Sequence, residues 1–92
     1  MNDTSTPNAS DGHADMTFQV RLGTEIRCRR IRLGLSQEHL AYRSGMSRNF
    51  VSLLERGEHD VQTGRLRQLA AALDTTLLAL LTFTDEPEQA AR

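Results

Sequence analysis

Polar side chains in the segment 47–56 have the types that bind nucleic acid. When the segment is projected as a helix at about 100° per residue, one side of it holds Arg48, Asn49, Ser52, Leu53 and Arg56. Guanidinium and amide groups form paired hydrogen bonds with guanine and adenine, and arginine and hydroxyl groups bind phosphate. This side carries no acid, whereas a solvated helix face usually mixes charges of both signs. The spacing therefore favours a surface that reads base edges and holds phosphates.

The opposite side of this helix holds Val51, Leu54 and, at its edge, Glu55. A buried carboxylate is costly without a partner. Arg30 lies one turn after Ile26 on the apolar face of an earlier helix. We therefore expect an Arg30–Glu55 ion pair between the two helices; two separately solvated charges are the alternative.

Two short helices with matching N-terminal signals surround a glycine turn. Ser36 precedes the helix 37–43 as an N-cap, and Ser47 precedes the helix that ends at Arg56. An apolar residue stands directly before each cap and another at the fourth position after the cap, which is the spacing of a hydrophobic staple. Because Gly45 joins the two helices, the segment is predicted to form a helix-turn-helix.

Three further helices complete the predicted fold. Leu22, Ile26 and Leu33 lie on one face of a helix from about Phe18, with Gly34 as its C-terminal stop. A fourth helix is expected over 63–73 and a fifth over 77–81, the latter capped by Thr76. No strand-like alternation occurs between these segments. The predicted fold class is all-α.

Charge divides the 92 residues into three parts. Residues 1–16 carry −3 and residues 85–92 carry −2, while ten arginines against six acids give the part between them +4. Both ends are predicted to be disordered acidic tails, over 1–16 and 84–92, around one domain at 17–83. Every basic residue is arginine, which suits bidentate phosphate or guanine contacts; genomic base composition is the alternative cause.

Several classes of protein are excluded by what the sequence lacks. Cys28 is the single cysteine, so no internal disulfide forms, and no Cys/His group has zinc-ligand spacing. No apolar run approaches the ~20 residues of a membrane helix, and no signal peptide is visible. The adjacent Ser36, Glu38 and His39 cannot form a nucleophile–base–orienter geometry. We expect a cytoplasmic protein that is not an enzyme and has no cofactor or metal.

The stretch from Leu22 to Leu81 resembles the phage-repressor helix-turn-helix family of the Cro/Xre type. The matching motifs are LGTEIRCRR, GLSQEHLA, GMS followed by FVSLLERG, and LRQLAAALDTTLLALL. Within the helix-turn-helix, the family's spacing is matched by Gln37, Ala41, Gly45, Val51 and Leu54. The resemblance implies a compact five-helix, lambda-repressor-like DNA-binding domain, with helices two and three as the helix-turn-helix and helix three in the DNA major groove.

The resemblance also implies roles for single residues. Base edges are expected to be contacted by Arg48, Asn49, Ser52 and Leu53, with Arg48 on guanine and Asn49 on adenine. Phosphates are expected to be contacted by Gln37, Ser47, Arg56 and Arg27. Arg30 and Glu55 stand at the family's interhelical ion pair, which agrees with the helical projection. Phe50 is favoured as a packing residue over a contact with a thymine methyl.

The implied function is sequence-specific binding of double-stranded DNA by a transcriptional regulator located at the nucleoid. The family pattern indicates a repressor that binds a palindromic operator as a homodimer. We expect the dimer interface on helix five, at Leu77, Leu78, Leu81 and Phe83. The alternative is an antitoxin that binds a toxin protein and represses its own operon. Activation would instead need a surface for RNA polymerase, and no residue stands out for that role.

The chain departs from the family pattern after the third helix. Members often carry basic residues after Gly57, but here Glu58 and Asp60 follow. We expect these acids to repel phosphates unless the loop turns away from DNA. Gly64 also falls in the first turn of helix four, where it costs about 0.5–1 kcal/mol relative to alanine.

Overall fold

The computed structural model describes residues 5–85 of the chain. Its elements are α1 (Ser5–Arg32), α2 (Gln37–Ser44), α3 (Arg48–Glu55), α4 (Thr63–Ala72), α5 (Leu77–Leu80) and the 3-10 helix η1 (Thr82–Asp85). No strand occurs among these residues, so the all-α prediction is confirmed for the described chain. The helix-turn-helix formed by the second and third helices is confirmed as well.

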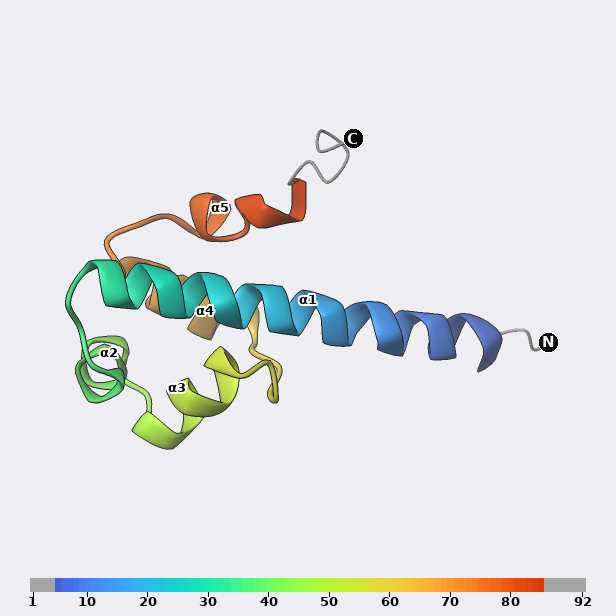
Figure 1. The fold of residues 1–92 in the computed structure, drawn as a ribbon, viewed down its shortest axis with the longest axis horizontal. Coiled ribbons are helices and arrows are strands. Elements are labelled where there is room, and N and C mark those ends of the chain that lie inside the picture. The colour runs from blue at the N-terminus through green and yellow to red at the C-terminus, as the bar shows by residue number, and fades with distance from the viewer. Residues whose placement is uncertain (1–4, 86–92) are drawn as a thin grey trace.

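The helices are arranged around α1 (Figure 1). In this view α2 and α3 lie on one side of α1, α5 and η1 lie on the opposite side, and α4 passes behind it. α1 contacts α3, α5 and η1, while α2 packs against α3 and α4. The helix-turn-helix is therefore supported by both α1 and α4.

The first helix begins earlier than the sequence indicates. α1 starts at Ser5 rather than near Phe18, and its first part extends past the other helices (Figure 1). Once packing has fixed one turn, each further residue adds a hydrogen bond at low cost, so a polar segment can continue a helix. The expected disorder is thus wrong for residues 5–16, which belong to α1, and for residues 84–85, which belong to η1; residues 1–4 and 86–92 lie outside the described residues. None of the described helices is both long and apolar enough to cross a membrane.

A single cluster of apolar side chains forms the core of the described chain. It draws on every α-helix and on η1, and its largest fully buried members are Ile26, Leu40, Val51, Leu69 and Leu80. Leu22 and Ile26 come from the face of α1 that the periodicity predicted, whereas the placement of Leu33 on that face is wrong, because α1 ends at Arg32 and Leu33 is 41% exposed. Val51 comes from the inner side of α3, so the projection of that helix is confirmed. The outer side of α3 consequently faces away from the core.

The predicted caps set the ends of the short helices. Ser36 Oγ accepts a hydrogen bond from the backbone N–H of His39, and Ser47 Oγ accepts one from Phe50, each at 3.0 Å. Thr76 Oγ1 caps α5 in the same way, through the N–H of Ala79. Gly45 ends α2 with φ at 73°, a left-handed conformation that glycine adopts without steric cost. The Gly45 turn and the Ser47 cap together set the direction in which α3 begins.

Close approach of two backbones sets the contact between α1 and α3. A Cβ atom placed on Gly23 would lie 2.2 Å from the carbonyl oxygen of Leu54 and 2.7 Å from that of Glu55. Both distances are far inside van der Waals contact, so only glycine fits at this position of α1. Gly23 therefore lets the end of α3 rest directly on the α1 backbone.

Candidate nucleic-acid interface

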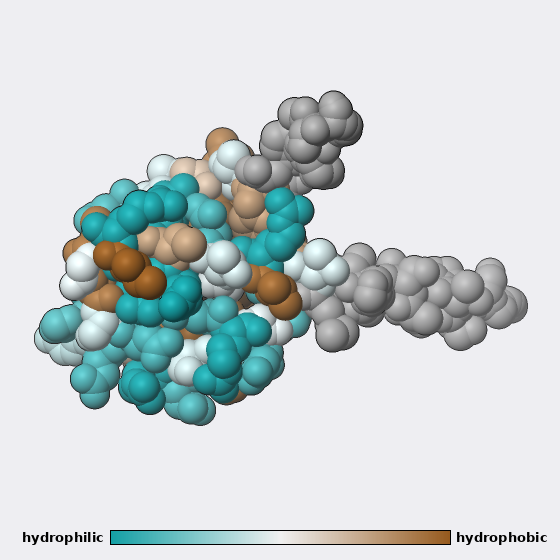
Figure 2. Space-filling view, viewed as in Figure 1, coloured by the Kyte–Doolittle hydropathy of each residue, from teal (hydrophilic) through white to brown (hydrophobic). Residues whose placement is uncertain are grey.

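The outer side of α3 presents two polar side chains that are free to bind. Arg48 and Asn49 follow the Ser47 cap directly, and both are exposed. Neither makes a hydrogen bond or ion pair with another described residue. Figure 2 shows that the surface below α1, where Figure 1 draws α2 and α3, is mostly hydrophilic. The first turn of α3 thus offers an unpaired guanidinium and an unpaired amide to solvent.

Further along α3, Ser52 and Arg56 are joined to each other. Arg56 Nη1 donates to Ser52 Oγ at 2.8 Å, and Arg56 Nη2 lies 3.2 Å from Glu58 Oε1. Leu53 is half-buried beside them. The structure therefore brings together the predicted base-contacting hydroxyl of Ser52 and the predicted phosphate-contacting Arg56.

The two acids after α3 both have local partners. Glu58 pairs with Arg56, and both side chains of this pair are more than half exposed. Asp60 Oδ1 accepts a hydrogen bond from the backbone N–H of Val61 at 2.9 Å. An exposed ion pair of this kind is worth at most about 1 kcal/mol, so a phosphate can displace Glu58 from Arg56. Whether these acids weaken DNA binding stays a prediction.

Arg30 and Glu55 form the predicted ion pair, so this expectation is confirmed. Arg30 Nε and Nη2 donate to the two carboxylate oxygens of Glu55 at 2.6 and 3.0 Å. The side chains are only 11% and 2% exposed. Arg30 Nη1 also donates to the carbonyl oxygen of Leu35 at 2.7 Å. The guanidinium therefore holds both α3 and the turn that leads into α2.

Gln37 has a structural contact that the sequence did not indicate. It opens α2, as predicted, but its Nε2 donates to Glu55 Oε1 at 3.0 Å. One N–H and the carbonyl oxygen of the amide remain for another partner. Gln37 therefore links the start of α2 to the Arg30–Glu55 pair, and a phosphate contact by its free N–H stays a prediction.

The two other predicted phosphate-contacting residues lie near the same surface. Ser47 Oγ accepts the capping hydrogen bond from Phe50, and its O–H can still donate to a second group. Arg27 is exposed one turn after Gly23 and one turn before Arg30. Because Gly23 and Arg30 both meet α3, Arg27 lies on that side of α1. Its charge is not paired within the described residues.

Other arginines of the basic central region have structural roles. Arg29 Nε binds Glu25 at 2.7 Å, and its two terminal nitrogens donate to Thr75 Oγ1 and to the carbonyl oxygen of Ala79. Arg21 Nη2 donates to the carbonyl oxygen of Phe83 at 2.8 Å. These arginines hold α5 and η1 against α1. The net positive charge of the central region therefore overstates the charge available to a nucleic acid.

The predicted interface residues on and after α5 do not form one exposed patch. Phe83 is only 8% exposed, because η1 turns it back toward α1, where its ring meets Phe18 and Arg21. Leu77 and Leu81 are half-buried against the core, and only Leu78, at 80%, is largely exposed. The inclusion of Phe83 in an exposed surface is wrong, since a 3-10 helix was not predicted there. Leu78 is the one of the four that stays available to a partner.

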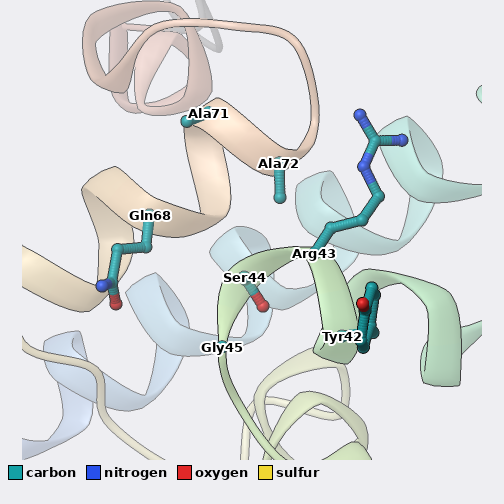
Figure 3. Close-up of a pocket in the computed structure, with 7 residues that line it drawn as sticks. All are labelled: Tyr42, Arg43, Ser44, Gly45, Gln68, Ala71 and Ala72. Atoms are coloured by element: carbon teal, nitrogen blue, oxygen red, sulfur yellow. The ribbon is translucent and has the colours of Figure 1, made fainter.

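A shallow groove lies elsewhere, between the end of α2 and α4 (Figure 3). Its lining includes Tyr42, Arg43, Gln68 and small residues such as Ala71, and it contains no carboxylate, histidine or cysteine. The Ser44 hydroxyl in this groove donates to the carbonyl oxygen of Leu40 at 2.7 Å. The groove consequently holds no acid–base pair that would activate a nucleophile.

The helix-turn-helix geometry agrees with the comparisons with known proteins. A family profile described as a helix-turn-helix domain matches residues 21–81. The chain belongs to the helix-turn-helix DNA-binding family. An uncharacterized HTH-type transcriptional regulator of Sinorhizobium fredii is 37% identical over 71 residues, which cover 77% of this chain and 92% of that protein.

Other helix-turn-helix proteins of known sequence or structure are similar over the same region. The control protein C.SmaI of Serratia marcescens is 41% identical over 67 residues, covering 73% of this chain and 80% of the relative. The crystal structure of the restriction-modification controller protein C.AhdI of Aeromonas hydrophila matches with a TM-score of 0.69 and 38% identity, covering 71% of this chain and 94% of that one. The similarity therefore extends over nearly the whole of these small regulators.

Proposed function

We propose that this helix-turn-helix protein is a sequence-specific regulator of transcription that binds double-stranded DNA as a repressor. The observation that carries the proposal is the first turn of α3, where Arg48 and Asn49 are exposed and unpaired. Arginine and asparagine are the side chains that read guanine and adenine by paired hydrogen bonds in the major groove. A short helix supported from behind by α1 and α2 can enter that groove.

The phosphate contacts in this proposal come from residues around the same helix. Arg27 and Arg56 supply charge, and the Ser47 hydroxyl and the free N–H of Gln37 supply hydrogen-bond donors. The Arg30–Glu55 pair contributes indirectly, because it holds α2 and α3 in one orientation. A role on DNA also implies that the protein works in the cytoplasm, at the nucleoid.

We further propose that the regulator acts as a homodimer on a palindromic operator. Two α3 helices about 34 Å apart would enter successive turns of one DNA face. Leu78 supports this arrangement as an exposed leucine on α5, on the other side of α1 from α3 (Figure 1). A homodimer through α5 would leave both recognition surfaces free.

A gel-shift assay with the DNA upstream of the protein's own gene tests the proposal. Binding should be lost with a shuffled duplex, and log affinity should fall with log salt by about 0.9 per phosphate contacted. Selection from random fragments should return a palindrome with half-sites one helical turn apart. Equal affinity for every duplex would contradict sequence-specific regulation.

The same selection tests the dimer, and a second experiment tests the antitoxin alternative. A single half-site without symmetry would contradict the dimer but not the DNA-binding role. An antitoxin would in addition form a stable complex with the product of an adjacent toxin gene, which a co-purification from the native operon tests. The similar protein C.AhdI is a restriction-modification controller, so a neighbouring restriction–modification gene would favour a dedicated regulator.

A further inference from the structure

Arg65, in the first turn of α4, is held by an aromatic ring of α3. Its guanidinium carbon lies 5.3 Å from the centroid of the Phe50 ring. Arg65 is exposed and makes no hydrogen bond or ion pair with the described residues. Stacking on an aromatic face orients a guanidinium while its N–H donors stay open. Arg65 is therefore oriented but chemically unpaired.

Phe50 is itself fixed from a second side. The His59 ring meets it edge to face, with centroids 4.9 Å apart. His59 Nδ1 lies 2.6 Å from the carbonyl oxygen of Asp60, which can only accept, so Nδ1 carries the proton and the ring is held in place. Phe50 also packs against the core. This aromatic platform, Phe50 with His59, limits the positions that the Arg65 side chain can take.

The platform borders a hollow directly beside the recognition surface. Phe50, His59, Asp60, Gln62 and Arg65 line the hollow, and Phe50 follows Asn49 on α3. The Asp60 carboxylate accepts a hydrogen bond from the N–H of Val61 and forms no ion pair with Arg65. Residues 57–62, between α3 and α4, contain no arginine. Arg65 is thus the first arginine of the chain after Arg56.

We propose that Arg65, positioned by Phe50, binds a phosphate of the DNA backbone beside the groove that α3 enters. The inference rests on the proposed function, because it needs α3 to lie in the major groove. A planar guanidinium with open donors matches the geometry of a phosphate, and the backbone lines the groove on both sides. Phe50 in this arrangement is a positioning residue and touches neither base nor phosphate.

The experiment measures binding to a selected operator duplex and to an unrelated duplex over a range of salt concentrations. Arg65→Ala should weaken binding to both duplexes alike, by about tenfold at low salt. The slope of log affinity against log salt should become shallower by about 0.9, the value for one phosphate. Discrimination between the duplexes should not change.

Arg67→Ala is the matched control for this substitution. Arg67 stands two residues further on α4, is also exposed and unpaired, and lines a different hollow with Gly64 and Gln68. Its removal takes away the same charge from the same helix, yet affinity and salt slope should stay close to those of the wild type. If Arg65→Ala and Arg67→Ala changed the affinity and the salt slope equally, Arg65 would act only through the net charge of the protein, and the inference would be overturned.

Substitutions of Phe50 test the positioning role. Phe50→Tyr keeps the ring and should bind as the wild type does, whereas Phe50→Leu should lose part of the affinity. Phe50→Leu combined with Arg65→Ala should bind no more weakly than Arg65→Ala alone, since the two residues act through one contact. Additive losses would overturn the positioning role.

Two further controls keep the outcomes separate. If melting curves show that Phe50→Leu unfolds, Arg65→Lys replaces it: the charge remains but the planar group is lost, and affinity should fall between those of the wild type and Arg65→Ala. Wild-type affinity for Arg65→Lys would overturn the role of the stacked guanidinium. If the wild type binds no DNA at all, the proposed function fails together with this inference.

Discussion

Arg30 and Glu55 are joined by two hydrogen bonds of 2.6 and 3.0 Å although 25 residues separate them in the chain. The Glu55 carboxylate also receives a hydrogen bond from Gln37, and Arg30 donates to the carbonyl oxygen of Leu35. One buried ion pair therefore connects α1, the start of α2 and the end of α3. The orientation of the proposed recognition helix depends on this connection.

Arg30→Ala should lower the free energy of unfolding by about 3 kcal/mol or more, because it leaves the Glu55 carboxylate buried without its main partner. For a domain of this size, that loss corresponds to a decrease in melting temperature of roughly 12 °C or more. Thermal unfolding followed by circular dichroism measures it. Arg32→Ala, which removes an exposed and unpaired arginine from the same helix, should change the melting temperature little. An unchanged melting temperature for Arg30→Ala would show that the ion pair does not stabilise the fold.

The sequence was informative wherever a local signal decides the structure. Ser36, Ser47 and Thr76 are N-caps in the structure because a hydroxyl before a helix satisfies backbone donors whatever the rest of the chain does. The Arg30–Glu55 pair followed from two helical projections and the cost of burying a lone carboxylate. Such inferences need only periodicity and local chemistry.

Features that depend on how elements meet were not visible in the sequence. Nothing in the sequence distinguished Gly23, because its role depends on the approach of the Leu54 carbonyl oxygen in the folded structure. Phe83 looked like part of an exposed surface until η1 turned its ring onto Phe18 and Arg21. The upstream start of α1 likewise reflects continuation of a helix that packing has already formed.

Gly23→Ala should destabilise the domain strongly, because its methyl group would have to displace the backbone of α3. We expect a loss of more than about 3 kcal/mol, at the upper end of single-substitution effects. Gly64→Ala is the matched comparison: it is also a helical glycine, but nothing lies within 4 Å of an added Cβ. That change should stabilise the protein by about 0.5–1 kcal/mol. Chemical denaturation of both variants measures the difference, and similar effects of the two would contradict the close approach of α1 and α3.

Gln37→Ala should have two separate consequences. Loss of the hydrogen bond to Glu55 should reduce stability by about 1 kcal/mol, while loss of the free amide N–H should weaken binding to every DNA sequence alike. Gln68→Ala, at an exposed glutamine of α4 without a partner among the described residues, controls for the change of residue type. Melting curves and gel shifts on the same samples separate the two effects. Reduced stability with unchanged DNA affinity would leave Gln37 as a structural residue alone.

Leu78→Asp should convert the proposed dimer to a monomer without unfolding it. The side chain is largely exposed on a short helix, and an aspartate near a helix N-terminus is favourable. Sedimentation at tens of micromolar should give a dimer for the wild type and a monomer for the variant. Tyr42→Ser, which changes an equally exposed side chain on α2, should leave the dimer intact. A wild type that sediments as a monomer with and without operator DNA would contradict the dimer.

Arg48→Ala should relax specificity at one base pair of the operator. The Arg48 guanidinium is exposed in the first turn of α3 and unpaired among the described residues, so its proposed contact is a bidentate one to guanine. For the wild-type protein, replacing that guanine by another base should reduce the binding free energy by about 1–3 kcal/mol. In the variant the same replacement should cost almost nothing.

Arg56→Ala is the comparison that distinguishes base reading from phosphate binding. Arg56 lies at the other end of α3, beside Ser52 and Glu58. Arg56→Ala should lower the affinity for all duplexes by the same factor and make the dependence of affinity on salt shallower. The preference for each base pair should stay as in the wild type. Affinities for a set of single-base operator variants measure both effects. If Arg48→Ala also lowered the affinity for every duplex equally, Arg48 would be a phosphate contact. The base contacts would then have to come from Asn49 and the rest of the exposed face of α3.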